Sequence, residues 1–520
     1  MAKNMWMFLI VFFAFFFRFW QLDKNPPSLF ADEVDIAYQV KIFKITGGDY
    51  LGNKFPIHFH SFSDWRTSLQ IYSSVIVSYF TNNDIYIVRL PSVIYSTLSI
   101  YLIYLITGSL YAPFLLAISP WSIHYGRTGF EVSGMLACLL AAIYFFKNKK
   151  YYRFSLFLCL SPYFYSTAKL FVPILLIVLF FIYKKEITQI KLKSYFVLCT
   201  LYFVLLLPLG IDTIKGHSDF RFSYISIFTM PHREQITDTL RYQDIVLSHP
   251  NETGISTPLY SKIFHNKIQL SLNKFIENYF QSFSTNFLFK TGDNNIRHGF
   301  GGHGLLYIID FFTIFVGLFI YKNKPTTRGL LFFWILLLAP IPFALTNDSN
   351  GGHSTRLILM LPSLIYFSSL GLKKYKYLIA IYLLLFINFW HYYTIHYPQD
   401  SASTWHYNIA NSIIESKKYN YSQIYFSDKY EPFLPFFLNC QPYLKPINLI
   451  DTNNNYFTGK NLDNKYFFGN INWTDYSSIP SNSLLIIPEI ENNQVPKSLK
   501  LLQKIPKKYE MAQNFYIYEK

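Results

Sequence analysis

Two adjacent acids near the N-terminus are the residues best suited to do chemistry. Asp32 and Glu33 follow the pair Pro26-Pro27 and an apolar stretch that ends at Leu22. A carboxylate in such a site can serve as the general base that removes a proton from a hydroxyl group. A structural interpretation is also open. The two acids would stand in the first turn of a helix running to about Ile45, where negative charge is favoured.

Three cations are candidates for binding a phosphate group, because Arg and Lys donate strong charge-assisted hydrogen bonds to phosphate oxygens. They are Arg127, Lys169 and Arg356, each near one end of an apolar block. Each also has a plainer interpretation. Arg127 could pair with Glu131, four residues further on, and Lys169 or Arg356 could extend to the membrane surface. Glu131 could instead orient Arg127 or touch an acceptor.

A glycine-rich segment holds two further polar candidates, His298 and His303, and His353 precedes Arg356. Glycines let a backbone come close to a ligand. Together with Asp293 the two histidines could hold a divalent metal, but the spacing is not that of a zinc site. A loop without a metal is the favoured interpretation, and no cofactor is predicted with certainty.

The composition excludes several classes of protein. The chain has 520 residues, of which 51% are hydrophobic and 15% are charged, and its net charge is +16. The apolar residues come in long blocks, which excludes an ordinary soluble enzyme, a disordered chain and a disulfide-stapled mini-protein. The four cysteines form neither a disulfide framework nor a zinc spacing. No nucleic-acid motif is present, so we attribute the positive charge to topology and contact with membrane lipid.

Hydropathy predicts that the chain is an α-helical polytopic membrane protein, and its helices must position the candidate residues. The first span covers 5–22, with Arg18 able to extend to the surface near its end. Further apolar blocks lie at 88–107, 110–123, 130–146, 154–168, 170–183, 194–210, 304–321, 328–346, 355–372 and 377–395. Block 68–80 must either fail to cross or belong to an extra pair. About 11 to 13 transmembrane helices are therefore expected.

The basic links between blocks orient the chain. The clusters at 147–153, 184–193, 322–328 and 373–376 are placed in the cytoplasm by the positive-inside rule. The N-terminus is then cytoplasmic and the C-terminus outside. The predicted domains are a membrane domain over 1–395, with outer loops 23–87 and 211–303, and a small extracytoplasmic α/β domain over 396–520. Within the latter, 401–418 is predicted helical, and 424–427, 483–487 and 514–518 are predicted strands.

Several segments resemble the GT-C glycosyltransferases. The likeness is greatest to the family 39 group, which includes protein O-mannosyltransferases and the aminoarabinose transferases of lipid A, and within it to uncharacterised bacterial members. It spans about 5–375. The segments that carry it are Pro26 to Tyr38, Thr46 to Pro56, Arg89-Leu90-Pro91-Ser92, Ser119 to Glu131, Asn286-Phe287-Leu288-Phe289 and His353-Ser354-Thr355-Arg356.

The resemblance implies a fold, a reaction and roles for residues. It implies a GT-C-type helical membrane domain that moves a hexosyl or pentosyl group, with inversion, from a polyprenyl-phosphate donor to a glycan, lipid or protein acceptor outside the cytoplasm, in the cell (inner) membrane. Asp32 would be the catalytic base, and Glu33 would assist or orient it. Because phosphate is already a good leaving group, no general acid is needed, but its charge requires cationic partners.

Other functions are a transporter and a flippase or polymerase of surface polysaccharide. Ion pathways usually bury charges at mid-membrane, whereas charges inside these predicted spans are few. Inverted repeats are not visible in the sequence. The chain has no GxxxxGK[ST] motif, which argues against an ATP-driven pump. The Asp32-Glu33 loop argues against a flippase or polymerase.

Overall fold

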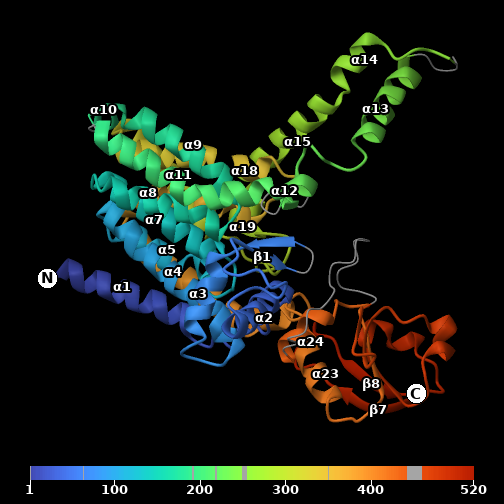
Figure 1. The fold of residues 1–520 in the computed structure, drawn as a ribbon. Coiled ribbons are helices and arrows are strands. Elements are labelled where there is room, and N and C mark those ends of the chain that lie inside the picture. Colours follow the sequence, from blue (N-terminus) through green and yellow to red (C-terminus); the bar gives the residue numbers. More distant parts are fainter. Residues whose placement is uncertain are drawn as a thin grey trace.

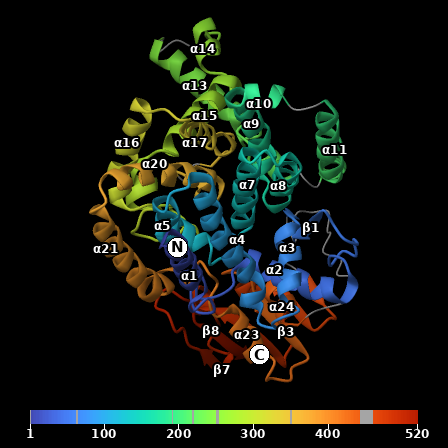
Figure 2. The same ribbon diagram turned by 90° about the vertical axis from the view of Figure 1, so that its left-hand side faces the viewer.

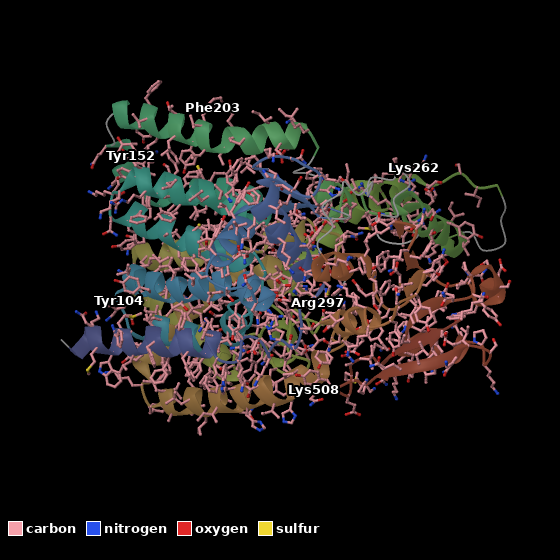
Figure 3. The ribbon with its side chains drawn as sticks, turned by 60° about the horizontal axis from the view of Figure 1, so that its bottom comes forward. Tyr104, Tyr152, Phe203, Lys262, Arg297 and Lys508 are labelled. Carbon is pink, nitrogen blue, oxygen red and sulfur yellow. The ribbon has the colours of Figure 1, made fainter. Side chains whose placement is uncertain are left out.

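The computed structural model describes residues 2–61, 64–189, 192–216, 220–248, 254–348, 351–441 and 460–520. Most of the chain forms a bundle of roughly parallel helices, and the C-terminal sheet lies at one end of it (Figures 1 and 3). The long helices of the bundle are α1(Ala2–Phe19), α4(Asp84–Thr107), α5(Tyr111–Ile118), α7(Val132–Lys147), α8(Tyr151–Phe164), α9(Thr167–Ile182), α11(Leu192–Ile214), α16(Ile308–Asn323), α17(Thr327–Leu338), α20(Leu361–Lys374) and α21(Leu378–His391).

Five segments of the described chain are long and apolar enough to cross a membrane. They are Asp84–Thr107, Tyr195–Ile214, Thr327–Ala344, Ser354–Lys374 and Leu378–Ser401, and Val132–Lys147 and Thr167–Ile182 are shorter apolar helices. All of them overlap blocks predicted from hydropathy. The protein is therefore a helical membrane protein. The block at 68–80 forms α3(Leu69–Val77), whose nine residues rise roughly 13 Å, far less than the ~30 Å of a bilayer core.

Arg18 does not extend to the membrane surface as the sequence suggested. It is wholly buried, and its guanidinium donates to the hydroxyls of Ser96 at 2.7 Å and Ser122 at 2.8 Å. Two further bonds reach the carbonyls of Ala14 and Ala117. A guanidinium has five N–H donors, and neighbouring helix ends supply enough acceptors to bury it. Arg18 therefore ties α1 to α4 and α5.

Short helices connect the long ones. They are α6(Pro120–Tyr125), α10(Lys184–Thr188), α12(Phe220–Ile225), η1(Asn286–Lys290), α18(Ile341–Ala344), α19(Ser354–Leu357), η2(Ile358–Met360), η3(Tyr392–His396) and α22(Tyr397–Ser401). Three helices, α13(Arg233–Ser248), α14(Leu259–Phe264) and α15(Lys267–Gln281), form a projection that leaves the bundle sideways in both ribbon views (Figures 1 and 2).

The segment after α1 folds into α2(Ala31–Thr46) and a hairpin of β1(His58–Ser61) and β2(Asp64–Thr67). The helix begins after Pro26-Pro27, as expected, because proline disfavours helix before it. It ends at Gly47, whose φ of 69° is the left-handed conformation that glycine adopts without steric cost. The strands pair antiparallel, with Phe59 opposite Arg66.

The C-terminal region is a mixed sheet with helices, as predicted. Its strand order is β4-β5-β3-β6-β8-β7, and β3 is parallel to both neighbours. The predicted strands are confirmed, whereas the predicted helix 401–418 is shorter. The elements are α23(Ile409–Ser416), β3(Gln423–Ser427), α24(Leu434–Cys440), β4(Lys460–Leu462), β5(Tyr466–Gly469), η4(Trp473–Ser478), β6(Ser483–Pro488), η5(Glu489–Gln494), β7(Lys500–Ile505) and β8(Phe515–Glu519).

Helix α2 is held between two hydrophobic clusters. On one side Ile36 and Val40 pack with Ile71 of α3 and Val88 of α4. On the other side Leu29, Val34, Tyr38 and Ile42 share a core with the C-terminal region, including Phe433, Phe437, Ile424 and Phe468. Lys41 of α2 also bonds Asp84 of α4 at 2.7 Å and the side chain of Asn439 at 2.9 Å. The helix that carries the acid pair is therefore fixed on both sides.

Candidate active site

Arg66 of β2 brings three carboxylates together. Its guanidinium lies 3.1 Å from Asp32, 3.3 Å from Asp35 and 2.9 Å from Glu131. Asp32 and Asp35 are three residues apart on α2, so both project from one side of the helix toward the hairpin. Glu131 comes from the turn before α7. The three acids therefore converge on one cation from distant parts of the chain.

Burial and the oppositely charged neighbours act against each other on the pKa of Arg66 and on that of Asp35. Burial alone would lower the pKa of Arg66, but Asp32, Glu131 and Asp35 together raise it above its usual value. Burial raises the pKa of Asp35 to about 6, and Arg66 opposes that shift. Asp35 is 1% exposed, whereas the side chain of Asp32 is 50% exposed. Of the two acids on this helix face, Asp32 is the one that a substrate can reach.

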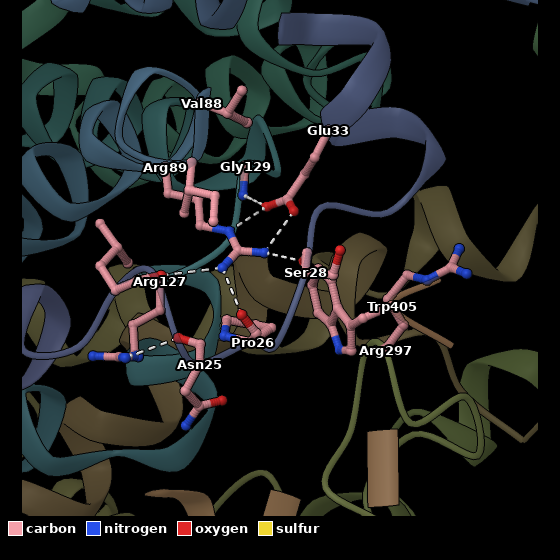
Figure 4. Close-up of polar contacts among 12 residues, drawn as sticks. Asn25, Pro26, Ser28, Glu33, Val88, Arg89, Arg127, Gly129, Arg297 and Trp405 are labelled. Atoms are coloured by element: carbon pink, nitrogen blue, oxygen red, sulfur yellow. Dashed lines mark hydrogen bonds and ion pairs between the residues drawn. The ribbon is translucent and has the colours of Figure 1, made fainter. Parts of the chain in front are cut away.

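Glu33 serves a different purpose from its neighbour. Its carboxylate is buried and accepts bonds from Arg89 at 2.8 and 2.9 Å and from the backbone N–H of Gly129 at 2.7 Å (Figure 4). Arg89 also donates to the carbonyls of Leu22 at 3.2 Å and Pro26 at 2.8 Å. The pair therefore fixes the proline loop and the first turn of α2. Glu33 supports the position of Asp32 through the backbone and does not line the cavity beside it.

A polar cavity of about 90 Å³ opens beside Asp32. Its walls come from six parts of the chain, and the described residues that line it include Asp32, Asp64, Arg66, Glu131, Tyr165, Ser166, His298, His353 and Thr355. The sequence predicted site roles for Asp32, Glu131, His298 and His353 but not for Arg66. The i, i+3 spacing of Asp32 and Asp35 was the available signal that a cation had to lie nearby.

A second cavity, about 460 Å³, adjoins the first and is mostly apolar. It lies between α8, α9, α11, α12 and α18 and is lined by side chains such as Leu170, Val172, Leu206, Leu209 and Ile225. Tyr165 and Ser166 line both cavities. An apolar groove that ends at a polar, charged pocket has the shape and polarity of a site for an amphiphile.

Two of the three predicted cations line this groove. Lys169 of α9 has its ammonium 3.2 Å from Nε2 of His58, whose other ring nitrogen pairs with Asp212 of α11. Arg356 of α19 lies 3.3 Å from Asp348 and donates to the Thr346 hydroxyl at 3.2 Å. Both are partly buried cations beside apolar walls, an arrangement suited to an anionic headgroup.

Arg127 lies away from the other two cations. It is wholly buried, and its guanidinium donates to the carbonyls of Phe17 at 2.8 Å, Gln21 at 3.1 Å and Asn25 at 2.8 Å. It holds the end of α1 and the proline loop and lines neither cavity described above. Glu131, its predicted partner, pairs with Arg66 instead.

The histidines do not form one group. His298 and His353 have ring centroids 4.8 Å apart at the polar cavity, and burial, with the nearby Arg297, lowers the pKa of His298 to about 3. The ring of His303 lies with its centroid 4.6 Å from that of Tyr392, and the two rings are tilted by 44°. Asp293 accepts the N–H of Ser354 at 2.8 Å. Within the described ranges, no three His, Cys, Asp or Glu side chains are grouped to hold a metal ion.

The C-terminal region reaches the same site. Arg297, which lies where the bundle meets the sheet (Figure 3), donates to the carbonyl of Thr404 at 2.7 Å and contacts His406 at 3.2 Å. His406 lies 3.4 Å from Glu431. Burial raises the pKa of Glu431 to about 7; Arg297 opposes this, and the charge of Asp32 adds to it. An acid of the C-terminal region is therefore close enough to sense the charge on Asp32.

No protein-family model and no curated protein sequence matches the chain. Solved structures do. ArnT from Cupriavidus metallidurans bound to undecaprenyl phosphate is 11% identical with a TM-score of 0.52, and the match covers 98% of each chain. The archaeal oligosaccharyltransferase AglB from Archaeoglobus fulgidus, in complex with an inhibitory peptide and a dolichol-phosphate, is 11% identical with a TM-score of 0.45 over 84% of this chain. This chain spans 63% of the length of AglB.

The likeness to ArnT shows the fold. Its near-complete coverage includes both the helical bundle and the C-terminal sheet. The fold that the sequence resemblance implied, a helical membrane domain, is therefore confirmed by the match to ArnT.

Proposed function

We propose that this protein is a GT-C glycosyltransferase that moves a sugar from a polyprenyl-phosphate donor to a hydroxyl or amine on the outer face of the membrane, with inversion at the anomeric carbon. One observation carries the proposal. The exposed carboxylate of Asp32 lies in a polar cavity that shares its wall with an apolar groove, and this groove carries Lys169 and Arg356. The undecaprenyl phosphate bound to ArnT supports this donor class.

Each group has a role in the reaction. Asp32 takes the proton from the acceptor as the acceptor oxygen or nitrogen forms its bond to the anomeric carbon. The bond between that carbon and the phosphate oxygen breaks, and both of its electrons leave with polyprenyl phosphate. Lys169 and Arg356 stabilise the phosphate charge. Arg66 keeps Asp32 ionised and oriented, because a nearby cation favours the charged form of a carboxylate.

The topology belongs to the same proposal. Eleven to thirteen spans in the cell (inner) membrane, with the N-terminus in the cytoplasm, place α2, the hairpin and the C-terminal region on the outer side. Residues 396–520 then form an extracytoplasmic domain on the membrane domain 1–395. A reporter that is active only outside the cytoplasm, fused after residue 400, should be active. Activity of a cytoplasmic reporter at that position would contradict the topology without bearing on Asp32.

The chemical test uses purified protein with polyprenyl-phosphate sugars, and the release of polyprenyl phosphate is measured. We expect Asp32→Asn to lower turnover by about 10²- to 10⁴-fold, the usual contribution of a general base. Because the side chain is half exposed, folding should be unchanged. Asp64→Asn is the matched control, since Asp64 lines the same cavity. Equal losses in the two variants, or normal turnover in Asp32→Asn, would remove Asp32 from the mechanism.

A further inference from the structure

The projection formed by α13, α14 and α15 exposes an apolar stripe. On α15 the side chains of Ile268, Leu272, Ile276 and Phe280 are 81%, 48%, 44% and 67% exposed. They recur every fourth residue, so they line one face of the helix. The adjoining α14 adds Leu259, Ile263 and Phe264, which are more than half exposed. Contiguous apolar surface of this kind marks a contact with a membrane or a partner.

Most charged residues of the projection are paired with one another. Lys267 pairs with Glu234, Lys274 lies 3.2 Å from Glu277, and Arg241 lies 3.3 Å from Asp238. Arg233 of α13 donates to the carbonyl of Lys267 and the hydroxyl of Ser271, which fixes the two long helices together. The face of α15 that these bonds leave uncovered is the apolar one.

The projection is anchored at one end of a candidate membrane span, the end that the proposed topology puts outside. Tyr279 of α15 donates to the carbonyl of Leu337 at 2.8 Å, and Asn278 donates to the carbonyl of Thr346 at 2.6 Å. Leu337 belongs to the candidate span Thr327–Ala344, and Thr346 lines the apolar groove. From this root the projection runs sideways past the outline of the bundle, with α15 nearer to the bundle than α13 (Figures 1 and 2). Phe280 at one end of the apolar stripe therefore lies next to the residues that attach α15 to the end of that candidate span.

We propose that the projection lies on the outer leaflet, with the apolar face of α15 and α14 embedded among lipid headgroups and upper acyl chains. Amphipathic helices bind membrane interfaces in this way. Since most charges are paired within the projection, we expect hydrophobic attraction to dominate and to act without anionic lipid. This membrane contact is independent of the proposed transfer reaction. The projection is nevertheless attached beside the apolar groove, because Asn278 bonds Thr346, which lines that groove.

The test uses the full chain in phosphatidylcholine nanodiscs, with a spin label at single cysteines. Cys199→Ser and Cys440→Ser remove the partly or fully exposed thiols, whereas Cys138 and Cys159 are buried. Labels are placed by Leu272→Cys and Ile276→Cys on the stripe, and by Glu277→Cys on the polar side as a matched control. Collision rates are measured with oxygen, which partitions into lipid, and with a water-soluble nickel chelate.

We expect the ratio of oxygen to nickel collisions to be several-fold higher at 272 and 276 than at 277. Nickel access at 272 and 276 equal to that at 277 would overturn the proposal, because the face would then lie in water. Low access to both reagents at 272 and 276 would overturn it as well, since protein would cover the face. Gel filtration checks that each variant is folded. If one of the two stripe variants does not fold, the collision ratio at the other position is sufficient for the test.

Discussion

Glu33 and Arg89 form an ion pair at 2.8 Å in which both side chains are 0% exposed. The neighbouring Asp32 points to the other side, where its half-exposed carboxylate meets Arg66 at 3.1 Å. Two consecutive acids at the start of one helix therefore have separate tasks. One is part of the core and fixes the helix, and the other is presented to a cavity. This separation leads to different expectations for the two substitutions.

Glu33→Gln should destabilise the protein strongly. Removing one partner of a buried ion pair leaves an uncompensated charge and costs about 3–5 kcal/mol. Thermal unfolding in detergent should show a lowered midpoint for Glu33→Gln and an unchanged one for Asp32→Asn. Glu234→Gln is the control, because it breaks an exposed pair with Lys267, and exposed pairs contribute little to stability. A midpoint for Glu33→Gln equal to that of the control would refute the structural role.

Arg66→Gln should shift the pH dependence of turnover. Without the guanidinium, Asp32 loses the cation 3.1 Å away and keeps only acidic neighbours, so it holds its proton to higher pH. The acid limb of the pH–rate profile should then move to higher pH by about 1 unit or more, and activity should recover partly under alkaline conditions. Arg66→Lys keeps the charge and should shift the limb less. An unshifted limb with a uniformly lower rate would show that Arg66 acts by packing alone.

Arg356→Gln should weaken the use of the donor more than it affects the acceptor. A hydrogen bond to a charged group contributes about 1.5–3 kcal/mol, which corresponds to a rise of roughly 10- to 100-fold in KM for the polyprenyl-phosphate sugar. Lys169→Gln should act in the same direction. Lys215→Gln is a control outside the groove, just after α11. If Arg356→Gln changed only the KM for the acceptor, the placement of the phosphate would be wrong.

Patterns along the chain predicted what depends on local sequence. Pro26-Pro27 followed by acids predicted where α2 begins, and the alternation around Ile424 and Ile486 predicted strands. The place of Arg127 near the end of an apolar block followed from hydropathy, but its burial and the direction of its side chain did not. Arg18, Arg89 and Arg127 are all buried by backbone carbonyls of other segments, and such acceptors leave no trace in the sequence.

The convergence on Arg66 could not be read from local patterns for a related reason. Asp32 and Glu131 are about a hundred positions apart, and the hairpin that carries Arg66 lies between them in the chain. The cover of α2 by the C-terminal region is equally non-local, because Tyr38 and Phe437 share one core. Hydropathy had suggested only that the C-terminal region lies on the same side as the acids. Its contact with α2 makes it part of the support of the site.

Asp35→Asn should remove a pH-dependent contribution to stability. Burial raises the pKa of Asp35 from 3.8 to about 6, so the folded protein retains this proton to a higher pH than the unfolded chain does. The stabilising contribution is therefore complete below about pH 4 and is lost as the pH rises through 6. The unfolding midpoint of the wild type, measured relative to Asp35→Asn, should fall between pH 4.5 and pH 7.5, by an amount equivalent to at most about 3 kcal/mol. Because Asn cannot titrate, the variant serves as the reference. If the midpoint of the wild type relative to the variant stays constant over this range, or rises with pH, Arg66 holds Asp35 ionised throughout.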